Sequence, residues 1–305
     1  MKRIVKRVLL GLVVLVVVLG GSVAAYATMQ SRVFDASMNK VYDVAPLSLQ
    51  RSTDPAVIAR GKHVAESIAP CASKECHGID GGGATKTIVL GPLGTINGPN
   101  ITSSGLGATY SDGELARLIR HGVKKDGRSV RFMPVQDFSW LPDSDIVAII
   151  SYLRTLPAVD RPNGVTEIGT LGKVLDVRNQ IVLDVARRID HAKADLAPPP
   201  TPTVEYGRYV GRLCTGCHGD HLSGGRIPGA PSSLPIPLNL TPHETGMKGW
   251  TYEDFDKLLS TGVRKNGKTL DPFMPLEAIG KADEIERKAL FAYLQSLPPA
   301  PFGGR

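Results

Sequence analysis

The stretch Leu213-Cys214-Thr215-Gly216-Cys217-His218-Gly219 places two cysteines on either side of two residues, with a histidine directly after the second. This spacing is typical of covalent haem attachment, because two thiols so placed can form thioethers with the two vinyl groups of one porphyrin. The imidazole of His218 then lies beneath the ring, where it can bind the iron. A motif of five residues can also arise by chance, so the prediction of a haem on Cys214 and Cys217 needs support elsewhere in the chain.

A second cluster of the same kind lies upstream, in Cys71-Ala-Ser-Lys-Glu-Cys76-His77. Four residues instead of two separate its cysteines, and Ser73 stands where the shorter spacing would put the first cysteine. The longer loop can bulge and bring Cys71 to a vinyl group, or the haem can be attached through Cys76 alone. We expect two thioethers here, with His77 as the iron ligand.

The two clusters belong to an internal repeat. His218 follows His77 by 141 residues, and Met274 follows Met133 by the same 141 residues. Two further segments recur at a similar distance: Asn-Ile-Thr (100–102) as Asn-Leu-Thr (239–241), and Tyr-Leu-Arg-Thr-Leu-Pro (152–157) as Tyr-Leu-Gln-Ser-Leu-Pro (293–298). The sequence therefore predicts a duplicated domain, with copies at 54–157 and 203–305.

The repeated methionines are candidates for the sixth iron ligand. Met133 and Met274 each lie between Phe and Pro at equivalent places of the two copies. A lone methionine is more often a filler of the core, but a Phe-Met-Pro repeated at a fixed distance after each histidine favours ligation through the soft thioether. His121 is the rival ligand in the first copy; because Thr261 takes its place in the second, we interpret it as a surface or loop histidine.

The N-terminus combines cations with a long apolar run. Four cations and no acid precede residue 8, and the eighteen residues 8–25 carry no charge, which is just enough to cross a bilayer as a helix. The positive-inside rule then places the N-terminus in the cytoplasm and the rest of the chain outside it. Ala25-Tyr26-Ala27 also fits a signal-peptide cleavage site. We favour an uncleaved anchor over 1–27, followed by an extended tether over 28–53.

Helical patterns are clearest in the first copy. They predict a helix that begins near Pro55, another over 111–119 and a third over 143–156 that stops before Pro157. The segment 158–202 between the copies contains a predicted helix over 171–189 and ends in a Pro-rich stretch. We expect that stretch to hold the two domains at a set separation.

The composition excludes several classes of protein. The chain has 305 residues, 42% hydrophobic and 21% charged, as expected for two globular domains. The net charge of +7 is dispersed without a basic stripe interleaved with aromatics, so we expect no nucleic-acid partner. Four cysteines are too few for a disulfide scaffold. A zinc site would need two close cysteine pairs in one domain, whereas each copy here has one pair, so we expect no zinc site.

The residues above resemble those of membrane-anchored bacterial dihaem c-type cytochromes, and each copy resembles a class I cytochrome c domain. The likeness covers about residues 54–298 and is most similar to the cytochrome subunits of periplasmic alcohol and aldehyde dehydrogenases. It implies an all-α fold: two tandem cytochrome c-like domains, a helical and Pro-rich linker, and one N-terminal transmembrane helix. It further implies that Gly61 and Gly207 lie where the first helix of each domain crosses the last, near Tyr152 and Tyr293.

The resemblance also implies the cofactors and their ligands. Two covalently bound haem c groups would be held by eight residues, of which the histidines and methionines bind iron: Cys71, Cys76, His77 and Met133 for the first haem, and Cys214, Cys217, His218 and Met274 for the second.

Two haems with both axial positions filled predict an electron carrier of a respiratory chain rather than an enzyme, with no catalytic residue. It would relay single electrons at the periplasmic or outer face of the cytoplasmic membrane. The donor would be a dehydrogenase or quinol-oxidising complex and the acceptor a cytochrome or oxidase. The alternative is a dihaem enzyme such as a peroxidase or thiosulfate dehydrogenase, which would need one open axial position; a haem sensor is a third class.

Overall fold

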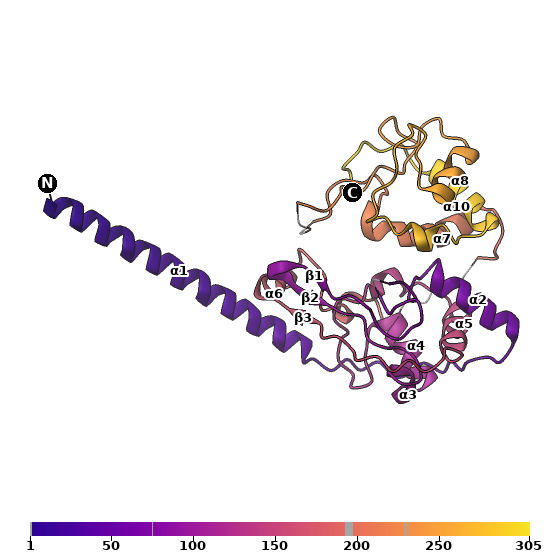
Figure 1. Ribbon diagram of the computed structural model, residues 1–305, viewed down its shortest axis with the longest axis horizontal. Coiled ribbons are helices and arrows are strands. Elements are labelled where there is room, and N and C mark those ends of the chain that lie inside the picture. The colour runs from indigo at the N-terminus through magenta and orange to yellow at the C-terminus, as the bar shows by residue number, and fades with distance from the viewer. Residues whose placement is uncertain (1, 75, 193–197, 229, 231) are drawn as a thin grey trace.

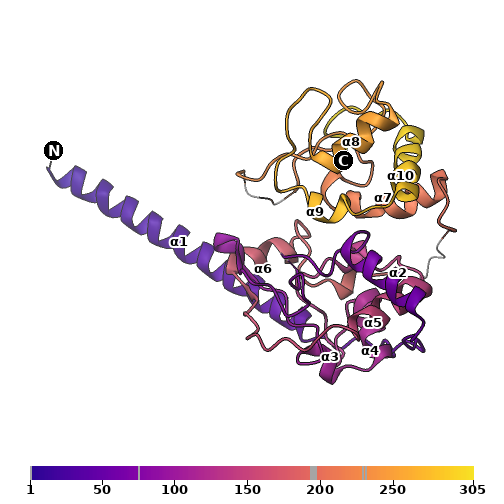
Figure 2. The same ribbon diagram turned by 45° about the vertical axis from the view of Figure 1, so that its right-hand side comes forward.

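Helices make up most of the regular structure of the computed structural model, which describes residues 2–74, 76–192, 198–228, 230 and 232–305. A long N-terminal helix projects away from two helical bodies that lie against each other (Figures 1 and 2). We name these bodies the N-terminal unit (residues 54–157) and the C-terminal unit (residues 203–305). The mostly helical fold was predicted.

Helix α1 (Lys2–Met38) is longer than the sequence predicted. Its apolar part is long enough to cross a membrane, but the helix continues through residues 28–38, where an extended tether was expected. That expectation is wrong because the helical conformation places Phe34 and Met38 on one face, where both are buried against Leu183. Asp35 on the same turns accepts a 2.7 Å ion pair from Lys173. The last turns of α1 are therefore docked on the body of the protein.

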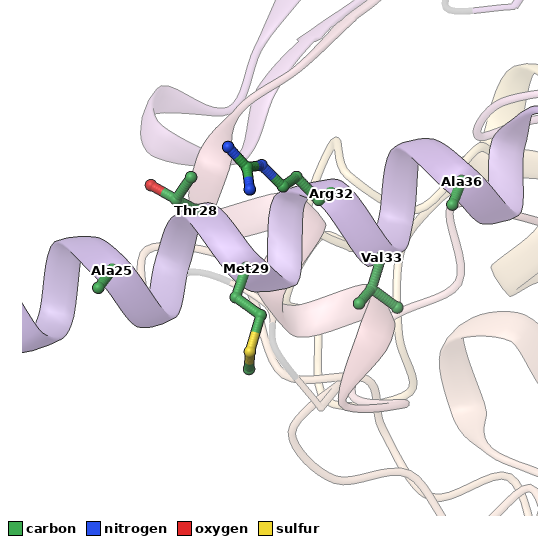
Figure 3. A pocket seen from close by; sticks show the side chains of 6 residues that line it. All are labelled: Ala25, Thr28, Met29, Arg32, Val33 and Ala36. Carbon is green, nitrogen blue, oxygen red and sulfur yellow. The ribbon is translucent and has the colours of Figure 1, made fainter.

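Another face of α1 is exposed. It forms a shallow, open hollow (Figure 3) that is lined by Ala25, Thr28, Met29, Arg32, Val33 and Ala36.

The tether after Met38 has no regular structure, yet it follows the surface of the N-terminal unit. The Tyr42 amide donates to the carbonyl oxygen of Gly127 (2.8 Å) and the Leu47 amide to that of Gly113 (3.1 Å). These bonds hold the tether against the unit along its length.

The N-terminal unit contains α2 (Pro55–Glu66), α3 (Leu106–Thr109), α4 (Asp112–His121), the 3-10 helix η2 (Val135–Asp137) and α5 (Asp143–Leu153). Helix α2 begins at the predicted place, where the Asp54 carboxylate accepts a hydrogen bond from the Ala56 amide and Pro55 occupies the first turn. Helices α4 and α5 agree with the predicted helices within a few residues. Helix α2 crosses α5 at Gly61, where a Cβ atom would overlap the carbonyl oxygen of Ala148.

The C-terminal unit contains α7 (Val204–His218), α8 (Tyr252–Thr261), α9 (Leu276–Ile279) and α10 (Glu284–Ser296). Helix α7 crosses α10 at Gly207, where a Cβ atom would overlap the carbonyl oxygen of Ala289. Tyr152 and Tyr293 lie beside the two glycines, as expected. The first and last helices of each unit therefore meet in the same way.

The segment between the units, and the part of the N-terminal unit that pairs with it, differ from the prediction. Strands β1 (Ile88–Val89), β2 (Gly94–Ile96) and β3 (Glu167–Ile168) form a small antiparallel sheet in that order, beside η1 (Gly91–Leu93). Helix α6 (Thr170–Val177) ends long before residue 189, and η3 (Ala186–Arg188) is a separate turn. The predicted helix over 171–189 is wrong because the buried Asp176 carboxylate accepts the Leu183 amide and an Arg187 ion pair, which fold the chain back.

The two units share one cluster of buried apolar side chains, which includes Ile149 and Trp140 from one unit and Tyr209 and Leu290 from the other. The units therefore touch directly, and the linker does not hold them at a distance. Residues 193–197 of the linker lie outside the described residues.

Replacing Gly61 or Gly207 by Ala tests the helix crossings. Each added methyl group must displace a backbone carbonyl, so we expect each variant to lose about 1–3 kcal/mol of unfolding free energy, the usual cost of overpacking. Thermal unfolding followed by circular dichroism measures it. Gly20→Ala, with no atom of another residue near the added methyl, is the control; equal stability of all three variants would contradict the proposed role.

Candidate functional site

The four cysteines lie at the end of the first helix of each unit or in the loop directly after it. Cys214 and Cys217 are on the last turns of α7, and the helix continues to His218 before Gly219 ends it with a φ of 82°. Cys71 and Cys76 follow α2 in a loop without helix, as their wider spacing requires. All four are thiols. Burial raises the pKa of the Cys71 and Cys214 thiols to about 12, so both are neutral at pH 7.

The two histidines after these cysteines have the same partner. The Nδ1 atom of His77 lies 2.8 Å from the carbonyl oxygen of Pro99, and that of His218 lies 2.6 Å from the carbonyl oxygen of Leu238. Because a carbonyl oxygen only accepts, each Nδ1 carries the proton and each Nε2 keeps its lone pair. Burial lowers the pKa of both imidazoles, which keeps them neutral. Both are thus in the form that binds a metal.

The residues whose carbonyl groups accept from the histidines are each followed by an asparagine that anchors the chain. The buried Asn100 directly follows Pro99; its Nδ2 donates to the carbonyl oxygen of Val159 (2.7 Å), and its Oδ1 accepts the Thr102 amide (2.9 Å).

The C-terminal unit repeats this arrangement. Asn239 donates to the carbonyl oxygen of Ala300 (2.7 Å) and accepts the Thr241 amide (2.9 Å). The Asn-Ile/Leu-Thr segments therefore anchor the chain directly after the carbonyl groups that orient His77 and His218, the candidate iron ligands.

The two methionines stand on identical backbone turns. Pro134 and Pro275, the residues after them, have φ and ψ of −78° and 64° and of −76° and 63°. In both turns the amide two residues after the methionine donates to the methionine carbonyl oxygen, at 2.8 Å for Met133 and 2.7 Å for Met274. Both side chains are half-buried, and Met133 packs against the core.

Each unit thus contains a candidate donor set of the kind that haem c requires: two thiols close together in the sequence, a neutral imidazole with Nε2 available, and a thioether on a repeated turn. The other histidines have different surroundings. His121 is buried, so its prediction as a surface residue is wrong: its Nδ1 lies 3.2 Å from that of His191, and burial with nearby cations lowers its pKa to about 4.

Two buried carboxylates join the units, and the sequence reasoning missed both. The Glu286 carboxylate, from α10, accepts His63 of α2 at 2.8 Å and Tyr206 of α7 at 3.3 Å. The Asp145 carboxylate, from α5, accepts the Tyr209 hydroxyl and an ion pair from Arg60 (2.9 Å).

These contacts are equivalent with the units exchanged. Asp145 and Glu286 are 141 residues apart, the spacing of the repeat, and His63 and Tyr209 are 146 residues apart, like Gly61 and Gly207. Each first helix therefore reaches the carboxylate of the other unit's last helix, which is the pattern of a two-fold interface. The equal spacing of two acids was the signal available in the sequence.

Comparison with known proteins assigns part of the chain. Residues 58–157 match the Cytochrome c family, and that part of the chain is a cytochrome c domain. The chain is 36% identical over 97 residues to the gluconate 2-dehydrogenase cytochrome c subunit of Pantoea cypripedii, which covers 30% of this chain and 22% of that protein.

Two further relatives are similar at the same level. The cytochrome c subunit of an alcohol dehydrogenase (quinone) from Gluconacetobacter polyoxogenes is 35% identical over 97 residues, covering 30% of this chain and 21% of that protein. The fructose dehydrogenase cytochrome subunit of Gluconobacter japonicus is 32% identical over 103 residues, covering 31% and 21%. The matched stretch is about a fifth of each relative's length.

The contact between His63 and Glu286 makes stability depend on pH. The hydrogen bond to Glu286 raises the pKa of His63, against the opposing effects of burial and of Arg60, with Asp283 adding to the rise. The protonated imidazole therefore contributes fully below the unfolded pKa of about 6.5, and the contribution is lost as pH rises through the raised pKa of the folded protein.

His63→Gln keeps a neutral donor but removes this charge. We expect it to lower the unfolding free energy by about 1 kcal/mol at pH 5.5, since charged hydrogen bonds are about twice as strong as neutral ones. The difference should shrink towards pH 9. Urea unfolding across this range measures it, with the exposed His221→Gln as control; a difference that grows with pH would contradict the assignment.

Proposed function

We propose that this protein is a membrane-anchored dihaem c-type cytochrome that relays single electrons at the outer face of the cytoplasmic membrane. The observation that carries the proposal is the repeated hydrogen bond from a histidine Nδ1 to a backbone carbonyl oxygen, directly after a cysteine in each unit. It leaves one neutral Nε2 per unit for iron. Each haem, when bound, supplies a centre that gains and loses one electron.

A second haem in the C-terminal unit is proposed from contacts, since the family match ends at residue 157. The C-terminal unit repeats the glycine helix crossing, the asparagine behind the histidine and the Met-Pro turn. It also has the shorter cysteine spacing, the better-formed attachment motif. These features support a cytochrome c domain over residues 203–305.

The residue roles follow from these donor sets. In the N-terminal unit Cys71 and Cys76 hold the haem through thioethers, His77 binds iron through Nε2, and Met133 supplies the sixth ligand. In the C-terminal unit the corresponding residues are Cys214, Cys217, His218 and Met274. A histidine and a methionine in each unit would together hold the haem iron, and a haem so held would supply electron relay rather than peroxidase-type chemistry.

The partners are proposed from the relatives and from α1. The relatives are cytochrome subunits of gluconate, alcohol and fructose dehydrogenases, so the donor is a dehydrogenase or a quinol-oxidising complex and the acceptor a cytochrome or oxidase. Helix α1 spans the membrane with its N-terminal cations on the cytoplasmic side. Because its last turns are docked on Leu183 through Phe34 and Met38, it holds the segment between the units, and with it the body of the protein, close to the bilayer on the periplasmic side.

Spectroscopy of the axial ligands tests the proposal. The protein should contain two haems per chain, both six-coordinate and low-spin, because each iron has a nitrogen and a sulfur ligand. Met133→Ala and Met274→Ala should each remove about half of the weak sulfur-to-iron charge-transfer band of the ferric protein. The unrelated Met29→Ala should leave it unchanged. A high-spin ferric haem in the native protein, or one haem per chain, would contradict the proposal.

Cys71 decides how the first haem is attached. In Cys71→Ala we expect the haem of the N-terminal unit to remain bound through Cys76 alone, with one vinyl group unreacted. The pyridine haemochrome band of that haem then moves to longer wavelength, because a free vinyl group extends the conjugation of the ring. Ser73→Ala is the matched control. An identical band in Cys71→Ala and in the native protein would mean that Cys71 forms no thioether.

A further inference from the structure

Asp137 belongs to the N-terminal unit but faces the cysteine segment (residues 214–217) on the last turns of α7 in the C-terminal unit. It ends η2, four residues after Met133, and η2 packs against α7. A methyl group added to Gly216, between Cys214 and Cys217, would lie 3.0 Å from the Asp137 Oδ2. One unit therefore places a carboxylate on the attachment loop of the other.

The segment that carries Asp137 is held firmly in this position. Trp140, three residues later, packs edge-on against Tyr209 of α7, with ring centroids 4.9 Å apart. The Arg212 guanidinium lies 5.3 Å from the centre of the Trp140 ring. Both contacts are with the helix that bears the cysteines, so the carboxylate and the cysteine loop are fixed relative to each other.

The charge of this carboxylate is poorly compensated. Within the described part of the chain no cation lies at ion-pair distance from Asp137, and burial alone raises its pKa to about 7. Arg305, far along the chain, donates to the Cys217 carbonyl oxygen at 2.9 Å and is a cation beside the cysteine segment.

The corresponding contact on the other side of the interface has a different charge balance. Lys74, in the Cys71–Cys76 loop, forms a 3.0 Å ion pair with Glu277, three residues after Met274. Both side chains are exposed, at 59% each, so water and the partner charge screen this carboxylate. The two cysteine loops thus face carboxylates in unlike environments.

We propose that Asp137 of the N-terminal unit tunes the redox centre of the C-terminal unit, because its half-buried negative charge favours the oxidised form of that centre. The inference rests on the proposed haem of the C-terminal unit. Oxidation adds one positive charge to a haem iron, and a nearby anion in a region of low dielectric constant stabilises that charge. Asp137 therefore lowers the reduction potential of the second haem more than that of the first.

Redox titration of the full-length holoprotein in detergent tests this inference, at pH 8.5, where the carboxylate is ionised. Asp137→Asn removes the charge with little change of shape. We expect the redox equilibrium of the second haem to shift about tenfold towards the reduced form, which is about 59 mV for one electron. The first haem should shift much less. The two waves are assigned in the Met274→Ala background, which displaces the wave of the second haem.

Three comparisons make the result decisive. Asp137→Glu keeps the charge and should return the potential close to that of the native protein. Glu277→Gln, at the exposed and paired carboxylate, should leave both waves nearly in place. If Asp137→Asn shifts neither wave, or shifts both equally, the inference is overturned while the proposed function stands. A C-terminal unit without haem, found by haem counting before the titration, overturns both.

Discussion

The close crossing of the first and last helix in each unit is the constraint on which the rest depends. At Gly61 and Gly207 the helix backbones touch, and no side chain larger than hydrogen fits between them. The crossing fixes the course of α2 and of α7; Cys71 and Cys76 follow the end of α2, and Cys214 and Cys217 lie on the last turns of α7. In the N-terminal unit the loop after the cysteines is then anchored by Asn100, which donates to the carbonyl oxygen of Val159, and the preceding Pro99 carbonyl group accepts from His77. The candidate ligands are thus positioned by backbone contacts, which depend little on the surface side chains.

A second level of organisation joins the two units. Glu286 is fully buried and Asp145 nearly so, and each receives donors from both units. A buried carboxylate is costly unless its hydrogen bonds are satisfied, so these two acids act against any arrangement that separates the units. The interface therefore confers a defined geometry, and it places each cysteine loop beside the segment after the other unit's methionine. A Pro-rich linker alone could not impose such a register.

Local chemistry could be predicted from the sequence, and long-range packing could not. The cysteine spacing, the following histidines and the repeated Met-Pro were sufficient to propose the donor sets, since each is a short motif, and those sets stay a prediction. The family match confirms a cytochrome c domain over residues 58–157. The second domain and the haem count stay predictions. The helix over residues 28–38 was missed because its apolar residues Phe34 and Met38 pack on Leu183, which is distant in the sequence. The helix over 171–189 failed because one buried aspartate, Asp176, reverses the chain.

The interface also distinguishes the two units from each other. Lys281 binds Glu66 at 3.3 Å, and at the equivalent positions Arg212 lies over the ring of Trp140. Pairing of two C-terminal faces would put Arg212 beside Lys281, two cations, and pairing of two N-terminal faces would put Glu66 beside Trp140. Only the pairing of an N-terminal with a C-terminal unit gives an attractive contact at both of these positions. Such specificity depends on the repulsion in the wrong pairings as well as on the attraction in the right one. The same divergence leaves one cysteine loop facing a screened carboxylate and the other a half-buried one. Two similar sites thereby acquire different electrostatic surroundings within a nearly symmetric frame.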